Sequence, residues 1–369
     1  MDKPLAGLKV VELARILAGP WCGQLLADLG AEVVKVERPG TGDDTRSWGP
    51  PFAEDGSAAY FHACNRGKSA VAADLATAVG QATVRALARD ADIVIENFKV
   101  GGLARYGLDH ASLSSLNPRL ITCSITGFGQ DGPYAARPGY DFIIQGMGGL
   151  MELTGEPDGS PMRAGIAIAD IFTGLYAATA ILAAVRGREA TGTGCHIDMA
   201  LLDTQVAVLA NQGMNYLVSG ETPRRLGNAH PNIAPYRVFG VADGHVIVAV
   251  GNDAQFRRLC VLLGTAADPR FETNAGRVRN RAVLDALLTP LIAARRRDEL
   301  LAALAAAGIP AGPINDVAEV FADPQVIARG LRIDQDGMPG IASPIIIDGV
   351  RQVAAGASPA LAGDELRGK

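Results

Sequence analysis

The sequence predicts an α/β protein with a large, Rossmann-like parallel-sheet domain and a smaller α+β domain. Short apolar runs alternate with helical patterns through the N-terminal half, as in LKVVEL, AEVVKVE and ADIVIENF. Polar loops rich in Gly and Pro separate these units, which is typical of a parallel sheet. The pattern changes after residue 225, where a strand pattern precedes several helices. We therefore place the large domain at 1–205, a linker at 206–224 and the small domain at 225–323.

The first elements form a βαβ unit. A strand at 8–13 is followed by a break at Ala18-Gly19-Pro20, a helix at 21–29 and a second strand at 31–37. Such an opening invites a dinucleotide-binding interpretation. However, the turn RILAGPWCG contains no G-x-G-x-x-G and has Pro where a phosphate needs Gly. The sequence therefore disfavours a nicotinamide cofactor.

The alternation continues with a helix at 79–90, strands in ADIVIENF and RLITCSITGFG, and a strand at 195–199 before another helix. Loops at the carboxyl ends of strands bind ligands in open α/β sheets. Four basic residues lie on loops that flank strand ends and predict a polyphosphate site: Arg38, Arg46, Arg66 and Lys68.

One acid, Asp170, interrupts an apolar run from Ile166 to Val185. A carboxylate in such surroundings must be solvated, hydrogen-bonded or used in chemistry. Two compatible interpretations remain open. Asp170 is the N-cap of a buried helix, or it is a nucleophile that attacks a carbonyl beside the N–H groups of that helix start. The central acid and the lack of basic residues at the start argue against a membrane-spanning helix.

Composition limits the classes of partner. A net charge of −5 and a pI near 5.6 argue against nucleic-acid binding through bulk electrostatics. The five cysteines include no CxxC pair and no zinc-like Cys/His spacing, so we expect reduced thiols, no metal site and a cytoplasmic protein. The N-terminus has no basic region followed by an apolar signal segment, so we expect neither export nor membrane association.

Several segments, taken together and in order, resemble class III coenzyme A transferases. This family includes formyl-CoA transferase and carnitine-CoA transferases, with α-methylacyl-CoA racemase as a sister branch. The resemblance covers nearly the whole chain. The matching segments are PLAGLKVVEL, AGPWCGQLLADLGAEVVKVERPGTGDDTR, NRGKS, IVIENFKVGGLARYGL, NPRLITCSITGFGQDGPYAARPGYD, GIAIADIFTGLYAA, GTGCHIDMALLD and GNAHPNIAPYRVF.

The resemblance implies site roles. Asp170 matches the aspartate that carries the acyl group. The matches to CoA contacts are Ala18, Arg38, Asn97, Phe98, Arg105 and Tyr140. The candidates for substrate binding are Arg15, Gly148 and His230. Arg15 and Leu17 depart from the His and Gln that many transferases have there, and the glycine at Gly148 also fits plain turn geometry. CoA and its thioesters are then substrates, and we expect no permanently bound cofactor.

The resemblance also implies a ping-pong mechanism. The Asp170 carboxylate attacks the donor thioester to give a mixed anhydride, and the CoA thiolate then converts the anhydride to an aspartyl-CoA thioester. An acceptor carboxylate reverses these steps. An anhydride lets a thioester pass between two carboxylates without ATP, and a closed site protects it from water.

Three alternatives are weighed against this reaction. The racemase branch has a basic His where this chain has Tyr140, and a phenol, which titrates at about pH 10, is a poor base at neutral pH. Formyl-CoA:oxalate transferases have a run of glycines where this chain has GNAHPNIAPY. The chain is therefore more similar to the branch that transfers CoA from succinyl-CoA to dicarboxylic acids. The third alternative is a non-catalytic CoA-binding protein.

The expected architecture follows from the same resemblance. Residues 324–369 return to complete the large domain, so that each subunit forms a ring. Two such rings are expected to interlock as a homodimer.

Overall fold

The computed structural model describes residues 3–362 and divides the chain into two compact units. Unit 1 comprises Met1–Leu150, Ala164–Ala210 and Pro324–Lys369, and unit 2 comprises Met151–Arg163 and Asn211–Asp323. Two details differ from the expected boundaries. The short segment before residue 164 belongs to unit 2, and a helix, α9 (Ala210–Ser219), lies where we expected a linker.

Unit 1 is built on a sheet that has six strands within residues 3–362. The strand order is β3-β2-β1-β4-β5-β6, and every neighbouring pair is parallel. This confirms the predicted α/β class. The sequence pattern does not predict β3, because SAVA is a short edge strand within a polar, basic segment. The strands are β1 (Lys9–Glu12), β2 (Glu32–Glu37), β3 (Ser69–Ala72), β4 (Ile93–Glu96), β5 (Ile121–Thr126) and β6 (His196–Ala200).

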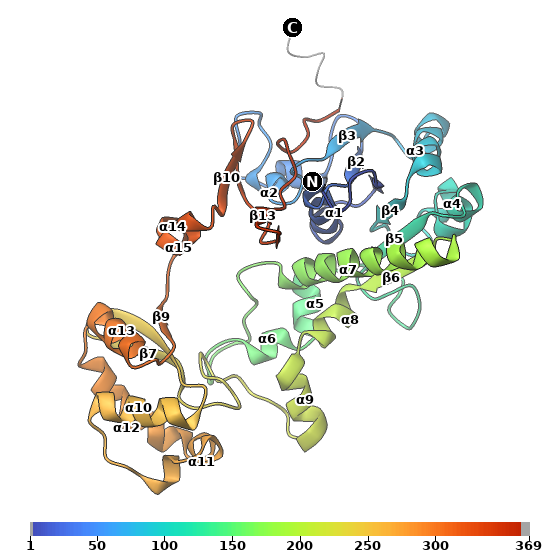
Figure 1. Ribbon diagram of the computed structural model, residues 1–369. Helices are drawn as coiled ribbons and strands as arrows, with labels where there is room; N and C mark the ends of the chain where they lie inside the picture. The colour runs from blue at the N-terminus through green and yellow to red at the C-terminus, as the bar shows by residue number, and fades with distance from the viewer. Residues whose placement is uncertain (1–2, 363–369) are drawn as a thin grey trace. The chain divides into compact units, whose positions relative to one another are not determined.

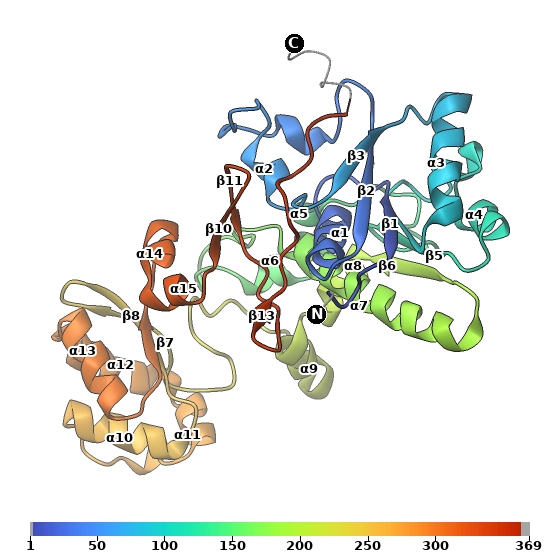
Figure 2. The same cartoon turned by 45° about the horizontal axis from the view of Figure 1, so that its top comes forward.

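Apolar side chains cover both faces of this sheet. Val10 and Ile93 point to one face and pack with α1 and α7, whereas Val11 and Val94 point to the other and pack with α3 and α4. Figures 1 and 2 show these helix pairs on opposite sides of the sheet. The helices of unit 1 are α1 (Ala18–Asp28), α2 (Ala59–His62), α3 (Ala78–Asp90), α4 (His110–Leu116), α5 (Asp141–Met147), α7 (Ile168–Thr191), α8 (Leu201–Ala207) and α15 (Pro324–Ala328).

Helix α1 begins at Ala18 rather than at Trp21, although the sequence predicted a break there. Pro20 is the third residue of the helix. A proline is tolerated in the first turn because the N–H that it lacks would have no partner within the helix. The helix start therefore lies closer to the end of β1 than expected.

The sequence predicted a buried helix, but helix α7 is buried along one side only. Ala169, Ala177 and Ile181 lie in the core, while Leu175 and Tyr176 are 40% and 46% exposed. On length and composition alone, α7 is apolar enough to cross a membrane. Its long exposed apolar side is a surface that another protein segment can cover.

The remaining elements form small antiparallel sheets and the helices of unit 2. The hairpins of unit 1 are β10 (Arg332–Gln335) with β11 (Met338–Ile341), and β12 (Ile346–Ile347) with β13 (Val350–Arg351). In unit 2 the strands β7 (Tyr236–Val241), β8 (Gly244–Ala249) and β9 (Ala311–Pro313) form one antiparallel sheet. The other helices are α6 (Leu150–Leu153), α10 (Asp253–Leu263), α11 (Asn274–Arg279), α12 (Arg281–Ala293), α13 (Arg297–Ala306) and α14 (Val317–Ala322). Unit 2 thus has the α+β class expected of the smaller domain.

A network of fully buried charges lies beneath the turn that joins β1 to α1. Glu12 accepts hydrogen bonds from Lys35 at 3.0 Å and from Lys68 at 2.7 Å, and Asp43 accepts one from Lys35 at 2.9 Å. Burial opposes the charge on Lys35, but the two carboxylates outweigh it and raise the pKa of this ammonium. Gly23 makes room for the network, because a Cβ there would lie 1.9 Å from Glu12 Oε2.

The prediction that Arg46, Arg66 and Lys68 bind polyphosphate is wrong. Arg46 pairs with Glu37 and Arg66 pairs with Asp28, each at 2.7 Å, and both guanidinium groups are buried. Lys68 belongs to the buried network. The charges of these cations are already neutralised by carboxylates and turned away from solvent, so they are not available to phosphate. Their ion pairs instead hold loops against the sheet. A position after a strand does not reveal which way a long side chain turns.

We expect Glu12→Gln to lower the free energy of unfolding by about 3–5 kcal/mol, because it leaves two buried lysines without their shared carboxylate. Urea unfolding measures the change. Arg186→Ala is the matched control, because it breaks an ion pair with Glu189 whose side chains are 81% and 60% exposed. The control should shift stability by less than about 1 kcal/mol. A similarly small effect of Glu12→Gln would contradict the role of the network.

Candidate active site

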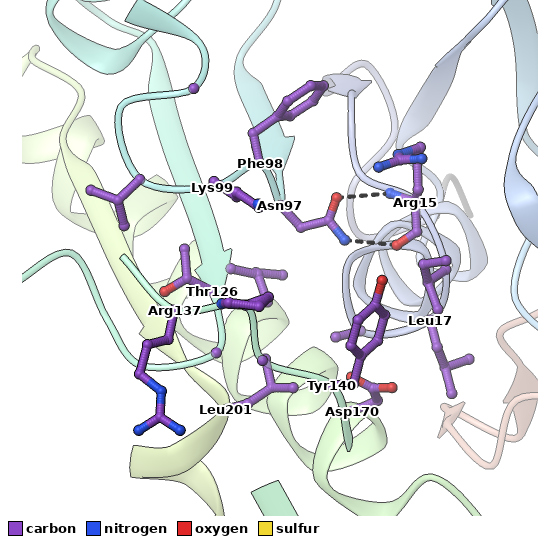
Figure 3. Close-up of a pocket in the computed structure, with 18 of the residues that line it drawn as sticks. Arg15, Leu17, Asn97, Phe98, Lys99, Thr126, Arg137, Tyr140, Asp170 and Leu201 are labelled. Atoms are coloured by element: carbon purple, nitrogen blue, oxygen red, sulfur yellow. Dashed lines mark hydrogen bonds between the residues drawn. The ribbon is translucent and has the colours of Figure 1, made fainter. Parts of the chain in front are cut away.

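A cavity of about 390 Å³ opens at the carboxyl ends of β1, β4 and β5 (Figure 3). The order of the sheet reverses between β1 and β4, since the chain builds β2 and β3 on one side of β1 and the later strands on the other. Open α/β sheets bind ligands at such a switch point. The walls come from the β1–α1 turn, the ends of β4 and β5, the loop before α5, and the starts of α7 and α8.

Asn97 clamps the first turn of the cavity. Its Oδ1 accepts a hydrogen bond from the Arg15 N–H at 3.0 Å, and its Nδ2 donates to the Arg15 carbonyl at 2.7 Å (Figure 3). The next residue, Ile16, has a φ of +74°, a left-handed conformation that β-branched residues rarely adopt. The Ile16 N–H donates to the buried Asp43 carboxylate at 3.2 Å. Contacts from two sides therefore hold this strained turn in one conformation.

Asp170 does not cap its helix, so the N-cap interpretation is wrong. Helix α7 begins at Ile168, which makes Asp170 its third residue. The N–H groups of Ala169 and Asp170 both donate to Asp141 Oδ1, at 2.8 and 3.3 Å. The flanking N–H groups of the first turn donate to main-chain carbonyls. The cap therefore comes from another helix, α5, and the Asp170 carboxylate is not needed for it.

The Asp170 carboxylate lines the cavity and accepts no hydrogen bond from any residue of the described chain. Burial, followed by the neighbouring charge of Asp141, raises its pKa to about 7. Tyr60 on α2 lies in the same environment, since burial and then Asp170 raise the pKa of its phenol to about 12. A carboxylate with a raised pKa and no structural partner is suited to chemistry rather than to support.

The start of α1 approaches α7 closely at this point. Gly174 lies one turn after Asp170, and a Cβ there would be 2.7 Å from the Ala18 carbonyl oxygen and 3.0 Å from Trp21 Cδ1. Ala18 lines the same cavity as Asp170, and within residues 3–362 its N–H has no acceptor. Helix N-termini stabilise negative charge that develops nearby. The cavity is therefore lined by a carboxylate without a hydrogen-bond donor and by a residue whose main-chain N–H has no acceptor within residues 3–362.

The structure gathers most of the residues singled out from the sequence. The cavity is lined by Arg15, Ala18, Asn97, Phe98, Arg105, Tyr140 and Asp170. Arg38 is exposed at the end of β2 and is not part of the lining. Gly148 is buried at the end of α5, where a Cβ would lie 2.3 Å from Gln205 Cγ, so close packing accounts for this glycine. His230 belongs to unit 2.

Sequence reasoning missed two basic residues of the cavity, Lys99 and Arg137, and the acid Asp44. Lys99 follows β4, and Arg137 lies in the loop between β5 and α5, so their positions after strand ends were the available signal. Both are exposed, and no carboxylate of the described chain pairs with either. Arg15, in contrast, pairs with Asp44 at 2.5 Å. The cavity therefore has excess positive charge.

Whole-chain comparisons agree with this arrangement. A family model described as CoA-transferase family III matches residues 5–365. The chain belongs to CoA-transferase family III. The transferase is similar to the succinate–glutarate CoA-transferase of Agrobacterium fabrum, with 59% identity over 93% of this chain and 89% of the relative. It is also similar to the succinyl-CoA:glutarate CoA-transferase of Mus musculus, with 42% identity over 90% and 77% of the two chains.

A solved structure agrees as well. The crystal structure of a CaiB/BaiF family protein from Brucella suis matches the transferase with a TM-score of 0.89 and 59% identity, covering 100% of this chain and 99% of that one. The predicted family and enzyme class are thereby confirmed. Tyr140, at the position of the racemase His, lines the same cavity as Asp170 (Figure 3).

We expect Asp170→Asn to stabilise the transferase at high pH. The raised pKa means that the folded state holds this proton more tightly than the unfolded chain, so stability present below about pH 4 is lost as the pH rises through about 7. Asparagine resembles the neutral acid and avoids that loss. Urea unfolding measures the free energy of unfolding at pH 5 and pH 8. The difference between variant and parent should shift in favour of the variant by about 2 kcal/mol from pH 5 to pH 8.

The exposed acid Asp131 provides the control for this comparison. The free energy of unfolding of Asp131→Asn should differ from that of the parent by the same amount at both pH values. A pH-independent difference for Asp170→Asn would show that the carboxylate is not protonated in the folded state near neutral pH.

Proposed function

We propose that the transferase moves CoA from succinyl-CoA to a dicarboxylic acid, with Asp170 as the residue that carries first the acyl group and then CoA. The observation that carries this proposal is the Asp170 carboxylate, which lines a basic cavity and has no hydrogen-bond partner in the described chain. The names of the Agrobacterium fabrum and Mus musculus relatives, which specify succinate or succinyl-CoA and glutarate, support this donor and a five-carbon acceptor.

The exposed cations of the cavity are suited to the phosphates of CoA. Lys99 and Arg137 lie on loops after β4 and β5, Arg105 lies in a short 3-10 helix after β4 (Ala104–Tyr106), and all three are exposed. Guanidinium and ammonium groups without carboxylate partners gain charge-assisted hydrogen bonds when phosphate binds. Arg38, exposed at the end of β2, is proposed as a further contact outside the cavity wall.

The pantetheine arm and thioester would then lie along the inner wall. Phe98 and Tyr140 offer aromatic surface, and Asn97 keeps one N–H after clamping the first turn. Ala18 offers its main-chain N–H to the thioester oxygen. These contacts would bring the thioester carbonyl to Asp170 in an orientation that makes attack effectively intramolecular.

The first half-reaction transfers CoA to the enzyme. An Asp170 oxygen attacks the donor carbonyl, the C–S bond breaks, and CoA leaves as its thiolate, which gives a mixed anhydride. The thiolate attacks the aspartyl carbonyl, the anhydride C–O bond breaks, and the donor acid leaves as a carboxylate. The N–H groups at the start of α1 would stabilise the oxyanion formed in these attacks.

The second half-reaction returns CoA to the acceptor. An acceptor carboxylate attacks the aspartyl-CoA thioester and expels the thiolate, which forms a new anhydride. The thiolate then attacks the acceptor carbonyl, and the Asp170 carboxylate is released. No oxidant, reductant or ATP is required, because a thioester and a carboxylate appear on both sides of the reaction.

Two residues are proposed to recognise the acceptor. The Arg15 guanidinium carries five N–H donors, of which one bonds Asp44, so the others can bind a second carboxylate. In unit 2, His230 Nδ1 accepts a hydrogen bond from the Asn232 N–H at 3.1 Å, which leaves the proton on Nε2 as a donor. Burial and then Arg281 lower the pKa of this imidazole and favour the neutral form.

We further propose a cytoplasmic homodimer of interlocked rings. The exposed apolar side of α7, which includes Leu175, Tyr176 and Leu182, supports an interface that covers it. Sedimentation of the full chain tests this proposal, and a species of 38.3 kDa at micromolar concentration would contradict it.

Asp170→Asn should reduce CoA transfer by roughly a thousandfold or more, because no carboxylate remains to accept the acyl group. The parent incubated with succinyl-CoA should gain the mass of a CoA adduct that hydroxylamine removes, and the variant should gain none. Asp203→Asn, at an exposed acid on α8, is the matched control. Transfer at the parental rate by Asp170→Asn would overturn the proposal. Exchange of an α-proton without an adduct would indicate a racemase.

Arg15→Leu should raise KM for a dicarboxylic acceptor about tenfold or more and leave KM for a monocarboxylic acceptor nearly unchanged, because it removes charge-assisted hydrogen bonds to the second carboxylate. Steady-state kinetics with glutarate and butyrate measure the split. Arg105→Leu serves for comparison and should raise KM for the CoA donor instead. Equal effects of Arg15→Leu on both acids would remove Arg15 from acceptor recognition.

A further inference from the structure

Asp141 makes an unusual connection between α5 and α7. It is the first residue of α5 and is 8% exposed, and its Oδ1 accepts the N–H groups of Ala169 and Asp170 at the start of α7. A helix N-terminus is usually capped by the residue that precedes it. Ala167, in that position here, has no side-chain acceptor. A carboxylate from another helix therefore supplies the cap.

A second side chain fixes the orientation of Asp141. Gln145, fully buried one turn later on α5, donates from Nε2 to Asp141 Oδ2 at 2.6 Å. Its Oε1 accepts the Ala164 N–H at 2.9 Å, and its Nε2 also lies 3.3 Å from the Ile166 carbonyl oxygen. Both oxygens of Asp141 thus have defined donors, and the chain leading into α7 is tied to the same pair.

This arrangement determines what the Asp170 carboxylate can do. An acid in the first turn of a helix normally gains from free N–H groups and from the positive end of the helix dipole. Here Asp141 already occupies the N–H groups of Ala169 and Asp170, and main-chain carbonyls accept those of Ile168 and Ile171. The Asp170 carboxylate therefore cannot fold back onto its own helix and remains available to the cavity.

The negative charge of Asp141 also affects Asp170, because it raises the pKa of that carboxyl group. The titratable groups that act on Asp170 or respond to it are Asp141 from α5 and Tyr60 from α2, and Arg15 and Tyr140 line the same cavity. Burial and then Asp170 raise the pKa of the Tyr60 phenol to about 12, so Tyr60 carries no charge near pH 7, and Arg15 pairs with Asp44. Asp141 is therefore the like charge that opposes ionisation of Asp170, and it supports the raised pKa that burial begins.

We propose that Asp141 is a positioning residue that keeps Asp170 unpaired and basic, so that Asp170 attacks the thioester as a strong nucleophile. The inference rests on the proposed function of Asp170. A carboxylate stripped of hydrogen bonds is more nucleophilic than a capped one, and a group whose protonation is balanced near the working pH combines basicity with a useful ionised fraction. Asp141 touches the helix start rather than the substrate and therefore acts through Asp170.

The test is the pH dependence of adduct formation in a single turnover with succinyl-CoA, measured by intact mass. Asp141→Asn keeps an acceptor for the α7 N–H groups but removes the charge. In the profile of adduct-formation rate against pH, the acid limb of this variant should lie about one pH unit below that of the parent. The plateau rate at high pH should fall several-fold because Asp170 is less basic. Asp141→Glu keeps the charge and should retain the parental acid limb.

Two further variants separate this role from plain structural support. Asp141→Ser offers a neutral acceptor and avoids placing an amide donor against Gln145, so it serves if Asp141→Asn does not fold. Thr77→Ala removes the side-chain cap of α3, where Thr77 Oγ1 accepts the Gly80 N–H at 3.0 Å, and should lower stability without moving the acid limb.

An unmoved acid limb in both neutral Asp141 variants would overturn the inference. The same result with an adduct that still requires Asp170 would leave the proposed function intact. An adduct in Asp170→Asn would instead overturn the proposed function itself. The stability gain of Asp170→Asn at pH 8 gives a readout independent of activity, and it should shrink in the Asp141→Asn background.

Discussion

The buried charge network beneath the β1–α1 turn is the constraint on which the site depends. Lys35 joins Glu12 to Asp43, and Asp43 accepts the N–H of Ile16, the residue with a left-handed backbone. Buried charges are tolerated only while each keeps its partner, so these strands and this turn must adopt one arrangement. The same arrangement directs the start of α1 toward the cavity. The contacts that stabilise the sheet are therefore the contacts that shape the cavity lined by Asp170.

The partners of each buried carboxylate separate support from chemistry. Glu12, Glu37 and Asp28 all face cations, and their ion pairs join strands or hold loops. Asp141 faces main-chain N–H groups and an amide, and so organises a helix start without neutralising its own charge. Asp170 has neither kind of partner within the described residues. This absence of partners is the observation that supports the proposed role of Asp170 as the residue that carries the acyl group.

Sequence reasoning succeeded where local pattern and physical role coincide. The apolar runs predicted the parallel sheet because a strand covered on both faces must be apolar throughout. Asp170 stood out because no other acid interrupts its apolar run, and the quoted segments were specific enough to predict the family. Contacts between residues distant in sequence decided how the first turns of α1 and α7 are built. Pro20 lies within α1 rather than before it, and Asp141 rather than Asp170 caps α7.

By itself the sequence determined the class of fold, the order along the chain of the strands of the large sheet except β3, and the position of the acid, Asp170, that interrupts an apolar run. Only the tertiary structure decided which basic residues face the cavity. Arg46 and Arg66 turn inward to carboxylates, while Lys99 and Arg137 remain exposed beside the cavity. All four lie in the segments that connect strands and helices of the sheet domain, Arg46 in a short 3-10 helix (Asp44–Ser47), and they look alike in sequence. The direction of a long charged side chain depends on a partner distant in sequence, and only folding brings the two together.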